Sequence, residues 1–361
     1  MEAHEILQDP FFVLLYGGVM MFSFVAALYL LLRRGNAIAP EVTSPVRLRR
    51  WAAVYMLTIV LSHFFWLLYV LHPAPAFYVL VCGLDMLMLF PSIAGVLLSM
   101  LQDRRRPLWP VLVSMAPIVV LLILCLVRAD EVLLLPLAIY VYALYALLML
   151  YAFFAVRRYG RWLRDNYVDL ENKEVWLSFL LLALFLLFFV MYSNTSEESG
   201  VLVYLLQINN ILIAGLLLWR VDTLPQLNEC GSSQMDESLQ ASAPQALPSD
   251  IATLLKKHCE SKHLYLEHDL TLAQLAQAIG TNHYYLSQHF AQQGLTYNAY
   301  IGGLRIRHFI RLYHKAVADQ RIFTAQQLAF ESGFHSYSTF SATFKQNMGT
   351  AVTAWMRDAE K

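Results

Sequence analysis

Seven long apolar runs in residues 1–220 constrain the fold more than any other feature of the chain. Each has roughly the 17–25 residues that an α-helix needs to cross a bilayer. Because the backbone in lipid must satisfy its own hydrogen bonds, we predict that the runs are helices. They are Phe11–Leu32, Trp51–Leu71, Phe77–Leu101, Leu108–Val127, Val132–Val156, Val175–Tyr192 and Val201–Trp219. Buried helices of a large soluble protein are the alternative, but they are usually shorter and rarely come seven in a row, and the chain is 58% hydrophobic.

Basic residues mark one side of these runs. Residues 1–220 contain 15 Lys or Arg, and only Arg128 lies on the opposite side. The others are Arg33, Arg34, Arg47, Arg49, Arg50, Arg104, Arg105, Arg106, Arg157, Arg158, Arg161, Arg164, Lys173 and Arg220. Because positive charge stays on the cytoplasmic side of a membrane, we expect the N-terminus outside and the C-terminus in the cytoplasm. This predicts a multi-pass protein of the cell (inner) membrane.

Residues 221–249 are predicted to form a flexible cytoplasmic linker. The stretch is rich in Ser, Gln, Pro and Ala and contains no Lys or Arg. A chain of this length reaches on the order of 30 Å, so the tail would stay near the membrane but turn freely. An inert spacer is the simplest interpretation, and a site for proteolytic release is the alternative.

The sequence shows no sign of a metal site, a cofactor or catalysis. Cys82, Cys125, Cys230 and Cys259 lack the spacing of metal ligands. No lysine occurs in a predicted span, which excludes a retinal Schiff base, and no protease or nucleotide-binding motif is present. We therefore predict that the protein is not an enzyme and carries no cofactor.

One pattern occurs twice in residues 250–361. Each copy opens with Thr-x-x-Gln, at Thr271 and at Thr324, which is a capping box for the start of a helix. A glycine follows nine residues after each threonine and is suited to ending that helix. Asn282 and Ser336 are then predicted to cap a second helix that packs on the first. Two short helices with a tight turn form a helix-turn-helix unit.

The stretch from Thr296 to about Lys315 lies between the two copies and is predicted to be one helix. Its length of about 28 Å approaches the roughly 34 Å between successive major grooves on one face of DNA. One chain can therefore lay two recognition helices along the same side of a duplex. The predicted fold class is all-α: a seven-helix transmembrane bundle in residues 1–220, followed by an all-α double helix-turn-helix domain in residues 250–361.

Residues 251–357 resemble the DNA-binding domain of the AraC/XylS family of transcriptional regulators. The matching stretches are LTLAQLAQAIGTNHYYLSQHF, TYNAYIGGLRI and LAFESGFHSYSTFSATFKQNMG, with the match ending near Trp355. The resemblance implies a seven-helix domain that binds promoter DNA and recruits or regulates RNA polymerase. Seven spans before such a domain are similar to membrane-bound regulators of Bacteroidetes-type bacteria. Val352 and Met356 depart from the family, which often has proline and arginine there.

The resemblance implies that the exposed face of the second helix in each unit reads bases. These residues are His283, Tyr284, Ser287 and Gln288 in the first unit, and Tyr337, Ser338, Ser341 and Ala342 in the second. The candidates for phosphate contact are Arg305, Arg307, Arg311 and Lys345. A solvated helix face is the alternative for each. Neither reading face holds an arginine, although arginine to guanine is the commonest specific contact. With 11 basic and 8 acidic residues the tail has a formal charge of +3, so its affinity for DNA should be modest and should fall with salt.

Few polar side chains interrupt the predicted spans. They are His63, Asp85, Gln207, Asn209 and Asn210. Polar residues at membrane depth usually face the interior of a helix bundle. We interpret them as a candidate signal pocket in which Asp85 and His63 pair, and polar contacts that hold the helices together are the alternative.

These features lead to one hypothesis for function and two alternatives. The chain is predicted to be a membrane sensor fused to its own transcription regulator, with promoter DNA, the lipid bilayer, RNA polymerase, a second copy of the chain and an unknown signal ligand as partners. One alternative is a membrane scaffold whose tail binds a protein. The other is a membrane transporter or enzyme with a regulatory tail.

Overall fold

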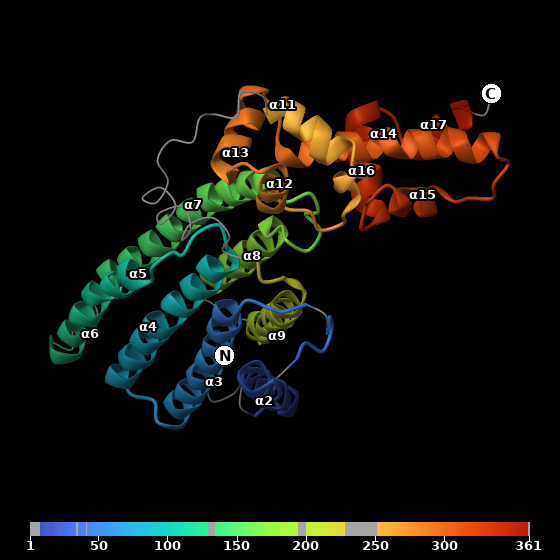
Figure 1. Cartoon of the computed structure of the whole chain (residues 1–361). Helices are drawn as coiled ribbons and strands as arrows, with labels where there is room; N and C mark the ends of the chain where they lie inside the picture. Colours follow the sequence, from blue (N-terminus) through green and yellow to red (C-terminus); the bar gives the residue numbers. More distant parts are fainter. Residues whose placement is uncertain are drawn as a thin grey trace. The chain divides into compact units, whose positions relative to one another are not determined.

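The computed structural model describes residues 8–33, 35–40, 42–128, 134–193, 200–227 and 251–359. Within these ranges the chain is helical, and the only β-type pairing is an isolated bridge between Tyr167 and Thr271 (Figure 1). The predicted all-α class is confirmed. The chain divides into two compact units: Met1–Arg157 with Val175–Asn228, and Arg158–Glu174 with Glu229–Lys361.

Apolar helices make up the first unit. Its helices are α2 (Pro10–Leu32), α3 (Val46–Leu71), α4 (Pro75–Met100), α5 (Trp109–Val113), α6 (Ala116–Arg128), the first part of α7 (Leu134–Asn166), α8 (Trp176–Ser193) and α9 (Gly200–Thr223). By length and composition, six helices of the described residues can cross a membrane: Pro10–Leu32, Val46–Leu71, Pro75–Met100, Trp109–Val127, Leu135–Asn166 and Val201–Thr223. The predicted sixth span contains α8, which is apolar but is not among these six. The count of seven spans stays a prediction.

Two details of the first unit differ from the expectations. The fourth apolar run is two helices, α5 and α6, because Pro117 lacks an amide hydrogen and its ring disfavours a helix that continues from α5. The linker is predicted to begin at residue 221, but α9 continues to Thr223 and both Val221 and Leu224 are fully buried. The predicted linker from residue 228 onward lies outside the described residues.

A buried ion pair closes one end of the first unit. The guanidinium of Arg33 at the end of α2 pairs with the carboxylate of Asp222 near the end of α9. The hydroxyl of Tyr29 donates to the same carboxylate at 3.1 Å, and Arg33 also donates to Ser44 Oγ at 2.7 Å. Breaking one partner of such a buried pair leaves an uncompensated charge, so the pair holds α2 and α9 together at this end.

The second unit contains both predicted helix-turn-helix copies. Its helices in residues 251–359 are α11 (Ile251–Leu254), the π-helical η2 (Leu255–Glu260), the 3₁₀ turn η3 (Leu264–Leu266), α12 (Leu272–Ile279), α13 (His283–Gln292), α14 (Tyr297–Ala318), α15 (Ala325–Glu331), α16 (Tyr337–Met348) and α17 (Val352–Ala359). The first copy is α12 and α13, the second is α15 and α16, and α14 is the helix predicted between them.

The predicted caps are confirmed at both copies. The hydroxyl of Thr271 accepts from Gln274 N, and the Gln274 side chain accepts in return from Thr271 N at 2.8 Å. Thr324 and Gln327 form the same capping box at the start of α15. The second helices are also capped as expected, because Asn282 accepts from Tyr284 N and Ser336 accepts from Thr339 N.

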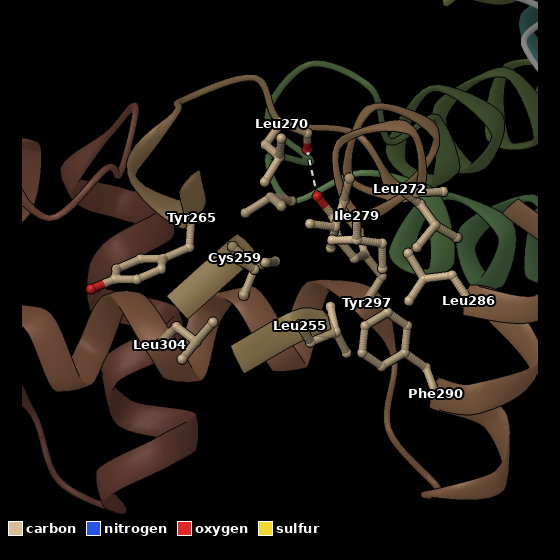
Figure 2. Close-up of a cluster of buried hydrophobic side chains, with 14 of the residues drawn as sticks. Leu255, Cys259, Tyr265, Leu270, Leu272, Ile279, Leu286, Phe290, Tyr297 and Leu304 are labelled. Carbon is tan, nitrogen blue, oxygen red and sulfur yellow. Dashed lines mark hydrogen bonds between the residues drawn. The ribbon is translucent and has the colours of Figure 1, made fainter. Parts of the chain in front are cut away.

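Each copy has its own hydrophobic core on α14. The first core includes Leu272, Leu275, Leu286 and Phe290 together with Tyr297, Ile301 and Leu304 of α14. Figure 2 shows this cluster, in which the hydroxyl of Tyr297 donates to the carbonyl of Leu270 at 3.0 Å. The second core gathers Phe334, Phe340 and Phe344 around Ile306, Phe309 and Tyr313 of the same helix. The cores of both helix-turn-helix copies are therefore packed on one continuous helix.

Candidate nucleic-acid interface

The buried side of α13 determines which of its residues are free for other contacts. Leu286 and Phe290, four residues apart, are buried in the first core. The predicted reading residues lie on the remaining face. Tyr284 is 55% exposed, Gln288 is also exposed, and Ser287 is half-buried. Three of the four predicted residues therefore reach the surface of the first helix-turn-helix copy.

His283 differs from its neighbours on α13. It is the first residue of the helix and is half-buried, and its Nε2 donates to the side-chain oxygen of Asn166 at 2.8 Å. Burial lowers the pKa of His283, so its ring is neutral at pH 7. The side chain that is predicted to contact a base is therefore hydrogen-bonded to Asn166 in this structure.

The second reading helix, α16, is built in the same way. Phe340 and Phe344 are fully buried in the second core, four residues apart. Tyr337, Ser338 and Ala342 are exposed on the opposite face, and Ser341 is half-buried. The hydroxyl of Ser338 lies 3.0 Å from that of Ser336, so it also takes part in the cap of the helix.

Three of the four predicted phosphate contacts lie on the surface. Arg307, Arg311 and Lys345 are exposed. Arg311 is partly engaged, because its Nη2 donates to the hydroxyl of Tyr265 at 3.1 Å. These side chains can reach a DNA backbone, which positions a protein on the duplex without specifying sequence.

The prediction for Arg305 is wrong. Its side chain is 1% exposed, and its guanidinium donates to the carbonyl of Tyr265 at 2.7 Å and to the carbonyl of Glu267 at 2.5 Å. It also lies over the ring of Phe334, which belongs to the second core. Burial lowers its pKa to about 10, so it stays charged at pH 7. Arg305 joins the first helix-turn-helix copy to the second, within the same compact unit, and is not available to a phosphate.

The sequence held a signal for this role. Ile301, Arg305 and Phe309 are spaced four residues apart, which places the arginine on the buried stripe of α14. A long charged side chain on such a stripe is more often a structural donor than a surface contact, because buried charges must be paired or hydrogen-bonded.

The five polar residues predicted in the apolar half divide into separate contacts. His63 is buried, with Nε2 at 2.8 Å from Gln207 Oε1 and Nδ1 at 2.8 Å from the carbonyl of Ile59. Asp85 instead accepts from the indole of Trp66 at 2.6 Å. Asn209 is buried and Asn210 is half-buried on α9. The structure brings His63 to Gln207, and gives Asp85 a partner other than the predicted His63.

Comparison with known proteins bears on the second unit alone. A family model described as a helix-turn-helix domain matches residues 275–358, from within α12 to α17. This part of the chain is a helix-turn-helix domain. The match supports DNA binding and transcription regulation, and it supports the resemblance to AraC/XylS regulators. No curated protein and no solved structure matches the chain.

Proposed function

We propose that the chain is a membrane-bound regulator of transcription, whose tail binds promoter DNA in a sequence-specific way and whose apolar half senses a signal. One observation carries the proposal: two helix-turn-helix units are built on a single helix, and each presents an exposed polar face on its second helix. In this type of motif the second helix enters the major groove.

The length of α14 supports simultaneous binding by both units. Its 22 residues measure about 33 Å, close to the roughly 34 Å between major grooves on one face of a duplex. Because each core is packed on α14, the two reading helices are held at a fixed separation. A protein-binding scaffold would not require this spacing.

The second unit also supports a topology of seven spans. It contains Arg158–Glu174, which is the end of α7 and the loop before α8, together with the tail that follows α9. Two segments packed in one unit lie on one side of a membrane, so the chain between them crosses it an even number of times. If α9 crosses, α8 crosses as well, and its 18 residues measure about 27 Å. The positive charges around Arg164 support a cytoplasmic location for the tail.

Cysteine labelling in intact cells tests the topology. A cysteine replacing Thr195, between α8 and α9, should react with a membrane-impermeant maleimide. A matched cysteine replacing Arg164 should react only after the cells are lysed, because it lies on the cytoplasmic side. Protection of position 195 in intact cells would show that α8 does not cross and would contradict seven spans.

The polar residues of the apolar half are the proposed place where the signal acts. The His63–Gln207 contact joins α3 to α9, and the hydroxyl of Tyr16 on α2 donates to the carbonyl of His63 at 2.6 Å. Three helices therefore meet at one polar group. A ligand that binds one arrangement of these helices better than another would shift the protein between the two.

A pair of substitutions separates base reading from phosphate contact. Gln288→Ala should weaken binding to a preferred site about 10-fold, because a glutamine–adenine pair contributes roughly 1–3 kcal/mol of discrimination. Lys345→Ala should weaken binding to all duplexes alike and reduce the slope of log affinity against log salt by about 1. Titration of full-length protein in lipid nanodiscs with preferred and scrambled duplexes measures both. If Gln288→Ala leaves the preference for one sequence unchanged, α13 does not read DNA through this residue.

A further inference from the structure

The C-terminal end of α7 and the loop that follows it form part of the DNA-binding unit. Arg158–Glu174 is separated from the tail by the whole of α8 and α9, yet it packs within the same compact unit. Val168 is 4% exposed and belongs to the first hydrophobic core with Leu272 and Leu286. The loop is thus a built component of the first helix-turn-helix unit.

This loop contacts the N-terminal ends of three helices. The backbone of Tyr167 pairs with that of Thr271, the cap of α12. The amide of Asn298 in the first turn of α14 donates to the carbonyls of Tyr167 and Val168. At the start of α13, His283 donates to Asn166. Residues 166–168, here called the docking strip, therefore contact the N-terminal ends of α12, α13 and α14.

The docking strip is held in shape by its own surroundings. The hydroxyl of Tyr159 donates to the carbonyl of Lys173 at 3.2 Å, and Lys173 Nζ donates to the carbonyl of Asp169 at 2.8 Å. The ring of Trp162 contacts the rings of both Tyr159 and Tyr167. These contacts brace the loop, and both of its ends continue into apolar helices.

The N-terminal end of α13 is the part of the first helix-turn-helix copy that is expected to contact DNA bases. Residues at the N-terminal end of a recognition helix contact the base edges. In this structure the docking strip lies against that end, and its Asn166 accepts a hydrogen bond from the side chain of His283. DNA and the docking strip therefore require the same surface.

We infer that the docking strip is an internal inhibitor of the first reading helix, which is released when the helices on either side of it move. The inference rests on the proposed function and names its regulation. The contact consists of one buried valine and a few hydrogen bonds, so it is weak enough to be reversed by a ligand. A coupling of roughly 1–3 kcal/mol between two sites corresponds to a change of about 5- to 150-fold in affinity.

A disulfide can hold the docking strip in place. Opposed residues of an antiparallel bridge have Cα atoms about 4.5–5.5 Å apart, within the range that a disulfide spans. The variant carries Tyr167→Cys and Thr271→Cys, with Cys82 and Cys230 replaced by serine. Cys259 can stay, because burial raises the pKa of its thiol to about 12 and makes it unreactive.

The test compares one protein before and after oxidation. Full-length variant in nanodiscs is titrated with a duplex that the reduced protein selects from a random pool, and Thr271→Cys alone is the matched control for loss of the cap. We expect oxidation to weaken binding at least 10-fold in the double variant and to leave the control unchanged. Separately, Asn166→Ala should strengthen binding about 5-fold in the unmodified background.

Two results would overturn the inference, and they differ in what they leave standing. Equal or tighter binding after oxidation would show that the docked strip is compatible with DNA or assists it, while the proposed function would stand. Selection of no duplex by the reduced protein, even at low salt, would overturn the proposed function and this inference with it.

Discussion

Replacing Arg305 with leucine is expected to lower the free energy of unfolding of the second unit by about 3 kcal/mol. The substitution leaves the carbonyls of Tyr265 and Glu267 without the charged donor that they share in the structure. It also removes the guanidinium that lies over the ring of Phe334 in the second core. The contact between the two helix-turn-helix copies would then weaken, so binding to DNA should fall with stability.

Hydrogen exchange of full-length protein in nanodiscs measures this effect on peptides from α14, α15 and α16. Arg307→Leu is the matched control, because Arg307 lies two residues away on the same helix and is exposed. That variant should change protection by less than about 0.5 kcal/mol, as is usual at surface positions. Equal effects of the two substitutions would show that Arg305 does not join the units.

Gly333→Ala is expected to destabilise the second helix-turn-helix unit by about 3 kcal/mol or more. Gly333 has a φ of 89°, which costs a side chain roughly 1–2 kcal/mol. A Cβ at this position would also lie 2.8 Å from the backbone of Leu266, which cannot move aside as a flexible side chain would. The added carbon would therefore separate the loop that Arg305 holds from the turn before α16.

The corresponding glycine of the first unit is a close control. Gly280 has a φ of 75°, but a Cβ there would have no atom within 4 Å. Gly280→Ala should therefore cost only the backbone strain, about 1–2 kcal/mol. Protection of α15 and α16 against hydrogen exchange in the first variant, and of α12 and α13 in the second, gives the comparison. Equal losses would show that the contact with Leu266 contributes nothing.

Features set by a few neighbouring residues could be predicted from the sequence. The capping boxes at Thr271 and Thr324 are local, since each needs only a threonine and a glutamine three residues later. The two cores follow from apolar residues four apart on α13 and α16. The exposed reading faces can then be predicted as well, because they lie opposite the buried residues of each helix.

Features set by contacts distant in sequence could not be predicted in this way. The charge of Arg305 favours the surface, but its place on the apolar stripe of α14 buries it, and the carbonyls that accept from it lie about 40 residues earlier in the chain. The docking of Val168 on the first core joins positions about a hundred residues apart, and nothing in the local pattern of Tyr167–Val168 indicates it. The partner of His63 is also distant in sequence, because Gln207 lies on α9, and the local pattern around His63 does not indicate it.

Hydroxyl-radical footprinting of full-length protein in nanodiscs tests the central claim most directly. The duplex is the one selected by the protein from a random pool, and the readout is cleavage of each strand at low and at moderate salt. Two protected patches about 10 base pairs apart on one face of the duplex are predicted, with protection that weakens as salt rises. A single patch, or none at low salt, would contradict a regulator that binds DNA with both of its units.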